Sequence, residues 1–452
     1  MPAKGRGLRL IGVLLLVWGW AQYAHAAPAE AEAGLAVTVA PDHERGVYER
    51  GEEIVFRVTV TRDGEAVTEG TVDYEIRLND FATMEEGSAE LSADGAAVRT
   101  RLSEPGALIL KATYTPADGE ALTGEVGAVV DPFSIQPSLP APEDFDEFWA
   151  AQKARLAETP MNARLTPVPD PLPDVTWGPA VECFDVQLDC PGGAPVSAYF
   201  VRPKDAAPGS LPASVSFHGA GVRNSNLQGA WNQAKRNCLG MDVNAHGLPN
   251  GKSREYYNDL RSGEMRDYAV RGIESRETYY FLGMYLRVAR ALEFLCSQPE
   301  WDGRNLIVTG GSQGGAQALV AAGLDERVTL VSAGLPALCD LTAATIERRP
   351  GWPFFTSPEL GVEYRDTVRY FDVCNFARRA RAAAVVRVGL IDHVCPPPTV
   401  LGACNQLKGE KYVFIVPSSG HSFTSRRDRA EADEKFREVM ERQLAAPAAA
   451  LE

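Results

Sequence analysis

The stretch NLIVTGGSQGGAQALVAAG, from Asn305 to Gly323, decides the fold of this chain. Its first five residues predict a short buried strand, and the small and apolar residues from Gly314 to Ala322 predict a tightly packed helix. The turn between them carries glycines two positions to either side of Ser312, which is the pattern of a nucleophile elbow. Such a turn strains the serine backbone and leaves little room for neighbouring side chains. We therefore predict Ser312 at the head of a helix, where the amide of Gln313 can donate to an oxyanion.

Strands and helices are predicted to alternate through the larger, second part of the chain. Apolar and β-branched runs predict eight strands, at Cys183–Leu188, Val196–Val201, Ala213–Phe217, Leu239–Val243, Leu306–Thr309, Thr329–Ser332, Val385–Leu390 and Tyr412–Val416. Helices are predicted at Glu143–Ala157, Ser275–Cys296, Gly315–Gly323, Val362–Arg381, Pro398–Leu407 and Arg429–Leu444. Buried strands separated by helices favour a mostly parallel sheet covered on both faces. Because the serine turn follows the fifth of eight strands, the order predicts an α/β fold of the α/β-hydrolase type.

The first part of the chain has a different pattern. Residues 27–134 contain short alternating runs, among them Ile54–Val60, Val72–Leu78 and Ala107–Tyr114, with Asp-Gly turns between such runs. This spacing predicts an all-β, immunoglobulin-like sandwich. We expect it to act as a spacer or packing module, with carbohydrate binding as the alternative. The proline-rich residues 135–142 predict a linker, and residues 143–446 form the predicted α/β domain.

Residues 1–26 have the parts of a secretory signal peptide. Three basic residues precede an apolar run from Leu10 to Trp20, and Ala24–Ala26 fits a small-residue cleavage site. We therefore expect a secreted or periplasmic protein that is cleaved before Ala27 and has no stable membrane insertion afterwards. An uncleaved membrane anchor is the alternative, although the apolar run is short for a membrane span. The formal net charge of −15 argues against a nucleic-acid partner.

The eight cysteines are scattered through the second half of the chain and include no C-x-x-C pair. We therefore expect no zinc or other metal site, and the chemistry inferred below needs no cofactor. Cys183 and Cys190 could form a local disulfide, and buried free thiols are the equal alternative.

A serine nucleophile needs a base, and histidine is the usual one. Among the six histidines, His421 lies just after the last predicted strand, where the base belongs in the serine–acid–histidine order of this fold. Asp392 directly follows the preceding strand and would orient the ring of His421. Asp372 is the competing acid, although it lies within a predicted helix.

Several other residues are candidates for the site. The glycine-flanked turn after the strand Ala213–Phe217 predicts the amide of Ala220 as a second oxyanion donor. His246 is predicted to contact substrate, with a structural hydrogen bond as the equal alternative. Trp352 lies in an aromatic-rich segment that could stack on a sugar, and core packing is the alternative. His393 is expected at the pocket rim or on the surface.

Four motifs recur in a fixed order along the chain. They are FDEFW from Phe145 to Trp149, GGSQGG from Gly310 to Gly315, YFDVCNFA from Tyr370 to Ala377, and GLIDHVCPP from Gly389 to Pro397 followed by Gly420-His421. In this order they resemble the motifs of the acetyl xylan esterase and cephalosporin-C deacetylase family. The resemblance implies that Ser312, Asp392 and His421 form a catalytic triad and that the amides of Ala220 and Gln313 form the oxyanion hole.

The chain departs from that family in two places. Asn244-Ala245-His246-Gly247 stands where the family has an R-G-Q motif, which implies a different pocket wall or hydrogen bonding. Small family members lack an amino-terminal sandwich and commonly form hexamers, so a homo-oligomer is possible here but no specific one is predicted.

These features predict a secreted serine esterase that removes acetyl groups from a carbohydrate partner, and acetylated xylan or its oligosaccharides is the expected substrate. One alternative is another α/β-hydrolase, such as a glucuronoyl or feruloyl esterase or a serine peptidase. The other is a catalytically inert carbohydrate-binding protein, against which the complete triad argues.

Overall fold

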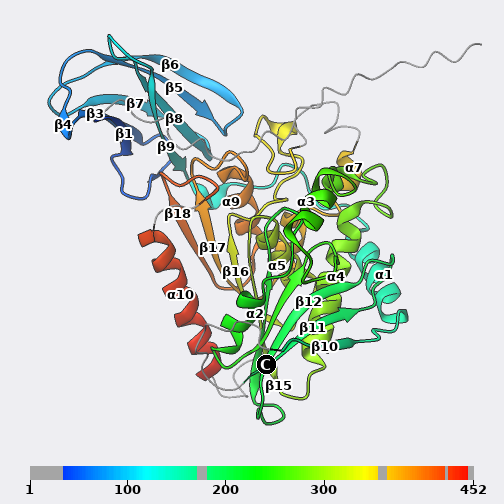
Figure 1. Ribbon diagram of the computed structural model, residues 1–452. Helices are drawn as coiled ribbons and strands as arrows, with labels where there is room; N and C mark the ends of the chain where they lie inside the picture. Colours follow the sequence, from blue (N-terminus) through cyan, green and yellow to red (C-terminus); the bar gives the residue numbers. More distant parts are fainter. Residues whose placement is uncertain (1–33, 170–180, 355–363, 423–425, 446–452) are drawn as a thin grey trace, which may run out of the picture.

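The computed structural model describes residues 34–169, 181–354, 364–422 and 426–445, which form an all-β domain and a larger α/β domain (Figure 1). The predicted signal peptide, residues 1–26, lies outside the described residues. So does the end of the aromatic-rich segment Arg348–Leu360, from residue 355 onward. Export of the chain therefore stays a prediction.

The amino-terminal domain consists of two β-sheets that share one apolar core. One sheet contains β1 (Leu35–Pro41), β3 (Glu53–Arg62), β4 (Glu65–Ala66) and β7 (Ala96–Arg101). The other has the order β2 (Val47–Tyr48), β9 (Leu122–Val130), β8 (Gly106–Tyr114), β5 (Thr71–Leu78) and β6 (Ala82–Glu90). Alternate residues point into the core, such as Phe56 and Val58 from β3 and Leu108 and Leu110 from β8. The all-β prediction is confirmed, whereas its immunoglobulin-like connectivity stays a prediction.

The predicted linker, residues 135–142, is fixed to the α/β domain along its length. It follows a short 3-10 helix, η1 (Pro132–Ser134), and its Ile135 is fully buried. The amide of Ser138 donates to Asp340 over 2.9 Å, and Arg369 donates twice to the carbonyl oxygen of Pro140. These contacts hold the segment in one place, so it does not act as a free tether between the domains.

The α/β domain is built on a nine-stranded sheet. Its strand order is β10 (Arg164–Pro167), β11 (Val181–Leu188), β12 (Val196–Pro203), β14 (Leu239–Asn244), β13 (Leu211–Phe217), β15 (Trp301–Gly311), β16 (Val328–Gly334), β17 (Ala383–Gly389) and β18 (Lys411–Val416). The strands from β14 to β18 in this order pair in parallel, and the others pair antiparallel. The mostly parallel α/β-hydrolase sheet is thus confirmed, with eight strands as predicted and a ninth, β10. All four residues of β10 are exposed, so it lacks the apolar run that reveals a buried strand.

Helices cover both faces of this sheet, as the alternation of its buried residues requires. Val308 and Val386 point into the larger core with α1 (Phe145–Glu158), α4 (Tyr280–Cys296), α5 (Gln313–Leu324), α8 (Val373–Ala377) and α9 (Pro397–Gln406). Ile307 and Val385 point to the opposite face, against α10 (Arg426–Ala445). The other helical elements of the described residues are α2 (Leu227–Ala234), α3 (Arg254–Ser262), α7 (Arg365–Val368), η2 (Tyr268–Val270) and η3 (Ala343–Ile346).

The helix predicted at Val362–Arg381 is wrong as a single element. Among the described residues it is two short helices, α7 and α8, separated at Phe371 and Asp372. The Asp372 carboxylate accepts a hydrogen bond from the amide of Cys374 and caps α8, while Phe371 is fully buried. A capping carboxylate starts a new helix at this point, which the apolar periodicity alone does not reveal.

The all-β domain packs over the ends of β17 and β18 (Figure 1). The amide of Gly127 in β9 donates to the carbonyl oxygen of Pro417, just after β18. His393, which follows β17, lies between Asp80 and Glu125 of the all-β domain. The side chain of His393 is still partly exposed, as expected of a rim or surface residue, and its ring in addition bridges the two domains.

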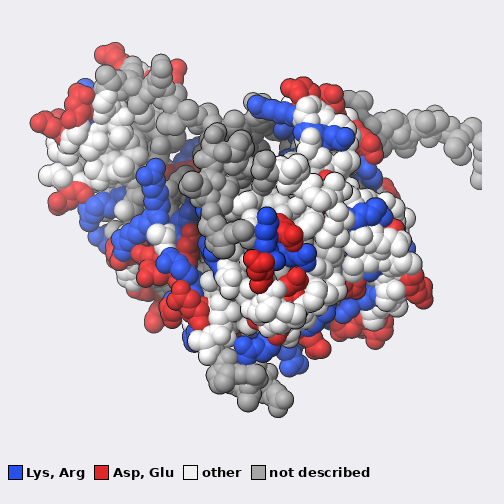
Figure 2. Space-filling model, turned by 60° about the horizontal axis from the view of Figure 1, so that its bottom comes forward, with Lys and Arg blue, Asp and Glu red and all other residues white. Residues whose placement is uncertain are grey.

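No helix among the described residues is long and apolar enough to cross a membrane. On the face shown in Figure 2, basic and acidic side chains of the described residues are interspersed, without a broad basic patch.

Candidate active site

Ser312 stands at the sharp turn between β15 and α5, in the strained conformation expected of a nucleophile elbow. Its backbone angles are φ 56° and ψ −123°, and its amide donates to the carbonyl oxygen of Gly334 over 2.8 Å. A Cβ on Gly310 would lie 2.2 Å from the carbonyl of Gly314, and one on Gly314 would lie 2.0 Å from the carbonyl oxygen of Phe217. Both glycines are therefore required by close backbone approach, and the turn lies directly against the end of β13.

The three predicted catalytic side chains come together in one hydrogen-bonded chain. Nε2 of His421 lies 2.9 Å from Oγ of Ser312, and Nδ1 lies 2.9 and 3.1 Å from the two carboxylate oxygens of Asp392. With the proton on Nδ1, the ring donates to Asp392 and accepts the hydroxyl proton of Ser312. This is the geometry of a serine–histidine–aspartate triad.

The backbone around Asp392 fixes its carboxylate. Asp392 is fully buried, and its Oδ1 accepts hydrogen bonds from the amides of Val394 (2.9 Å) and Cys395 (2.8 Å). The competing acid, Asp372, accepts instead from the amides of Asp340, Leu341 and Cys374, away from His421. The arrangement thus assigns the orienting role to Asp392 and a structural role to Asp372.

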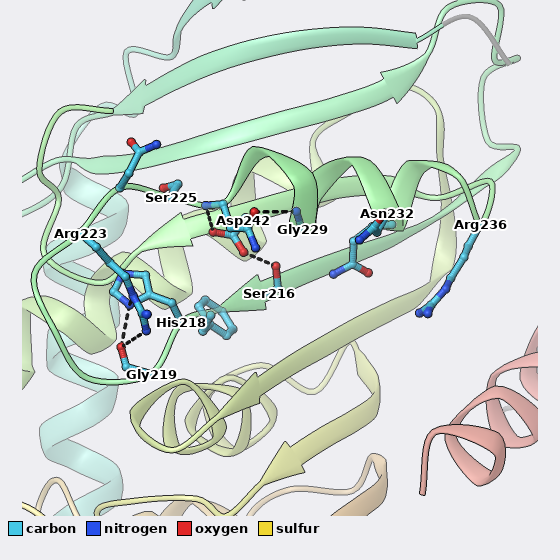
Figure 3. A pocket seen from close by; sticks show the side chains of 13 residues that line it. Ser216, His218, Gly219, Arg223, Ser225, Gly229, Asn232, Arg236 and Asp242 are labelled. Atoms are coloured by element: carbon cyan, nitrogen blue, oxygen red, sulfur yellow. Dashed lines mark hydrogen bonds between the residues drawn. The ribbon is translucent and has the colours of Figure 1, made fainter. Parts of the chain in front are cut away.

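The loop after β13 lies beside the nucleophile. A Cβ on Gly219 would be 3.5 Å from Cβ of Ser312, which places the predicted oxyanion donor Ala220 next to the elbow. Nδ1–H of His218 donates to the carbonyl oxygen of Gly219 (2.7 Å), and Arg223 donates to the same oxygen (3.0 Å) (Figure 3). Nε2 of His218 accepts from the amide of Ala245 (3.2 Å). Both side chains therefore hold the loop in place.

The same loop borders a polar pocket of about 690 Å³ along α2 (Figure 3). Asp242 lies at its floor and accepts hydrogen bonds from Ser216 (2.5 Å) and from the amide of Asn226 (2.6 Å). Burial raises the pKa of Asp242 to about 6, although these donors and the charge of Arg223 oppose the rise. Asn232 and Arg236 line the pocket farther along α2 (Figure 3).

His246 supports the loop from behind. Its side chain is 4% exposed, its Nε2–H donates to the carbonyl oxygen of Gly221 (3.3 Å), and its Nδ1 accepts from the hydroxyl of Tyr280 (2.7 Å). Burial, together with the neighbouring His218 and Arg287, lowers its pKa to about 3. These contacts favour the structural alternative for His246 over direct contact with substrate.

Asn244, in the segment that departs from the family's R-G-Q motif, also supports the loop after β13. The side chain of Asn244 is fully buried, donates to the carbonyl oxygen of Arg223 (2.7 Å) and accepts from the amide of His246 (2.9 Å). Burial, together with the charge of Arg223, lowers the pKa of His218 to about 4. Both loop histidines are therefore neutral at pH 7, as their hydrogen bonds require.

Tyr268 is a contributor that the sequence reasoning missed. Its hydroxyl donates to Oε1 of Gln313 over 2.6 Å, and its ring packs against His246 and Trp352. Trp352 is 5% exposed and its amide donates to the carbonyl oxygen of Val394 (2.8 Å), so core packing is favoured over sugar stacking. No sequence motif marks Tyr268, because it lies in the short η2 between longer helices.

The cysteines do not form disulfides in the described structure. All eight are free, including Cys183 and Cys190, and burial raises the pKa values of these two thiols to about 12 and about 11. One group of potential metal-ligand atoms, from Asp392, Cys395 and His421, lies within 4.8 Å. Two of these side chains already belong to the triad, where His421 is bonded on both ring nitrogens.

The fold defines the chain as an α/β-hydrolase, and the site has the geometry of a serine–histidine–aspartate triad. The model of the acetyl xylan esterase family matches residues 134–436, and the chain belongs to that family of carboxylic-ester hydrolases. Acetyl esterase Axe7A of Xylanibacter ruminicola is 29% identical over 391 residues, which cover 85% of this chain and 86% of that protein.

Two solved structures are similar to the α/β domain. The acetyl xylan esterase from Paenibacillus sp. R4 is 30% identical with a TM-score of 0.57, and covers 68% of this chain and 98% of its own. Acetyl xylan esterase 1 from Thermoanaerobacterium sp. JW/SL YS485 is 24% identical with a TM-score of 0.54, and covers 68% and 96%. The matches cover nearly the whole length of both solved proteins but only 68% of this chain, so about a third of this chain has no counterpart in them. The match to Axe7A covers more of the chain than the α/β domain and so reaches into the all-β domain.

Proposed function

We propose that this enzyme is an exported serine esterase that removes acetyl groups from carbohydrate, with acetylated xylan or xylo-oligosaccharides as substrate. The observation that carries the proposal is the hydrogen-bonded chain from Ser312 through His421 to Asp392 in a member of the acetyl xylan esterase family. The names of the three relatives, an acetyl esterase and two acetyl xylan esterases, support acetyl as the acyl group. The pattern of residues 1–26 supports export.

Acyl transfer to Ser312 is the first chemical step. As Oγ attacks the acetyl carbonyl carbon, Nε2 of His421 takes the hydroxyl proton, and Asp392 stabilises the imidazolium that forms. The tetrahedral intermediate then collapses, the proton on Nε2 passes to the sugar oxygen, and the sugar alcohol leaves. Water then attacks the acetyl-enzyme with His421 again as the base, which releases acetate and restores the serine.

Two backbone amides stabilise the negative oxygen of each tetrahedral intermediate. Gln313 is the first residue of α5, so its N–H has no acceptor within the helix, and the positive end of the helix dipole lies beside it. The amide of Ala220 supplies the second donor from the loop after β13. A donor of this kind contributes about 10²–10³-fold to kcat, which explains why the loop is braced by His218, Arg223 and Asn244.

The proposal is tested by acetate release from acetylated xylan, from an acetylated monosaccharide and from p-nitrophenyl acetate. We expect the wild type to act on all three and the Ser312→Ala variant to release no acetate while it keeps its circular dichroism spectrum. Activity retained by Ser312→Ala would refute the nucleophile. Hydrolysis of p-nitrophenyl acetate without action on either sugar ester would refute the carbohydrate substrate but not the esterase activity. Faster cleavage of a feruloyl or glucuronoyl ester than of the acetyl esters would show that the enzyme is not an acetyl esterase.

A further inference from the structure

The loop that carries the catalytic acid is held by the other domain. His393 follows Asp392 directly, and its Nδ1 lies 2.9 Å from Oδ2 of Asp80, in the turn between β5 and β6. Its Nε2 lies 3.2 Å from Oε2 of Glu125 in β9. Both ring nitrogens can donate at once only when the ring is protonated, so the contacts describe an imidazolium between two carboxylates. Asp80 is almost fully buried, which restricts the position of this bridge.

The backbone of β9 touches the same region. A Cβ on Gly127 would lie 2.3 Å from Cβ of Leu390, two residues before Asp392, so β9 lies directly against the acid loop. The amide of Gly127 also donates to the carbonyl oxygen of Pro417 (2.9 Å), at the start of the segment that leads to His421. One strand of the all-β domain thus contacts both segments that bear the acid and the base.

A third segment of the site is attached in the same way. The amide of Arg349 donates to the carbonyl oxygen of Asn79 (3.2 Å), and its guanidinium lies 3.4 Å from Asp80. Three residues farther on, the amide of Trp352 donates to Val394, inside the acid loop. The turn around Asp80 therefore reaches the acid loop by two routes, directly through His393 and indirectly through Trp352.

We infer that the amino-terminal all-β domain is a structural part of the active site and that His393 is a positioning residue, which fixes the acid loop against Asp80 and Glu125 so that Asp392 meets His421. The inference goes beyond the proposed function, but it depends on Asp392 being the catalytic acid. It gives a specific form to the packing role expected of this domain and sets aside the spacer role.

The charges around His393 maintain the bridge at neutral pH. Hydrogen bonds to Asp80 and Glu125 raise its pKa to about 9, against the opposing effect of partial burial. The bridge to His393 in turn lowers the pKa of Glu125. The other charged groups that face this cluster are Arg77 and Arg349, beside Asp80, and Lys111, whose charge acts on Glu125. Because the folded-state pKa lies above the ordinary value of 6.5, the bridge contributes its full stability below that pH and loses it as the pH rises through about 9.

A second ion-pair cluster between the domains serves as a matched control. Arg45, just before β2, donates to Asp428 and to Glu431 of α10, each over 2.6 Å. This cluster also attaches the all-β domain, but its contacts are on α10 and not on the segments that carry Asp392 or His421. If the all-β domain were merely attached to the α/β domain and did not position the acid loop, loss of the His393 bridge or of the Arg45 ion pairs would have the same effect on kcat.

The experiment compares kcat and KM of His393→Gln and Arg45→Gln with the wild type, on p-nitrophenyl acetate. We expect His393→Gln to lower kcat about tenfold with little change in KM, because a misplaced acid weakens the base without altering substrate contacts. Arg45→Gln should keep the wild-type kcat. Between pH 7 and pH values well above 9, the ratio of the wild-type kcat to that of His393→Gln should fall towards one as the wild-type imidazolium loses its proton.

A kcat for His393→Gln equal to that of Arg45→Gln, or a pH-independent ratio, would overturn the inference. If His393→Gln does not fold, Glu125→Gln tests the same bridge from the all-β domain by removing one of the two carboxylate charges. It should lower kcat by a smaller factor than expected for His393→Gln, and an unchanged kcat would contradict the inference. Failure of the triad itself is distinguishable, because Ser312→Ala or Asp392→Asn would then remain active.

Discussion

The two ends of the catalytic triad are held in place by different physical means. At the Ser312 end, backbone atoms of β13, β15 and α5 approach so closely that Gly310 and Gly314 have no room for a Cβ. At the Asp392 end, amides of the loop itself hold the carboxylate, and side-chain charges from a separate domain also fix the loop. Steric fixation is insensitive to pH and salt, whereas fixation by a partly exposed ion pair is sensitive to both. The nucleophile is thus set by local sequence, and the acid depends on how the domains meet.

The largest effect should come from the acid itself. Asp392→Asn should lower kcat by about 10⁴-fold, because an amide no longer selects the tautomer with the proton on Nδ1 of His421. Asp372→Asn is the matched control, since Asp372 caps α8 and its carboxylate bonds backbone amides away from the triad. Its kcat should stay close to that of the wild type. Steady-state kinetics on p-nitrophenyl acetate measure both, and a larger loss in Asp372→Asn would exchange the roles of the two acids.

The next effect concerns steric fixation at the nucleophile end. Gly314→Ala would place a Cβ 2.0 Å from the carbonyl oxygen of Phe217, a backbone atom that cannot move without shifting β13. We expect kcat to fall by more than about 100-fold, because both the nucleophile and the oxyanion loop are displaced. Gly311→Ala, one residue before the serine, meets its nearest atom only at 3.8 Å and should be far milder. Similar kcat values for the two variants would show that backbone crowding does not fix the elbow.

A smaller effect is expected where a side chain acts on the nucleophile end. Arg223→Ala removes the hydrogen bond to the carbonyl oxygen of Gly219 and should lower kcat about tenfold, because the oxyanion loop becomes less ordered. Arg236→Ala removes a second arginine from the same pocket, at the far end of α2, and should leave kcat unchanged. If Arg236→Ala reduced kcat as strongly, the charge of the pocket would matter rather than the support of the loop.

The difference between the two ends also explains what could be predicted from the sequence. Ser312, Asp392 and His421 each lie in the segment that follows a strand of the parallel sheet, so the strand order was enough to bring them together. The glycines at the elbow could be recognised in the sequence because close backbone approach leaves no room for a side chain at Gly310 and Gly314. The mostly parallel sheet could be predicted equally well, since eight of its strands contain runs of apolar and β-branched residues.

The contacts that support the site could not be predicted in the same way. His393, Asp80 and Glu125 are far apart in the sequence, and nothing in their local patterns links them. The roles of His246 and Trp352 depend on Tyr268, which lies in a short 3-10 helix without a motif. Ionic and aromatic contacts of this kind appear only after the domains and loops have been placed in space.

The central claim, that Ser312 is the nucleophile activated by His421 and Asp392, is tested most directly by covalent labelling. The wild type is treated with a fluorophosphonate, digested, and analysed by peptide mass spectrometry. The account predicts one label on the peptide that contains Ser312, no label in Ser312→Ala, and much slower labelling in His421→Ala. A label on another residue, or labelling of His421→Ala at the wild-type rate, would contradict it.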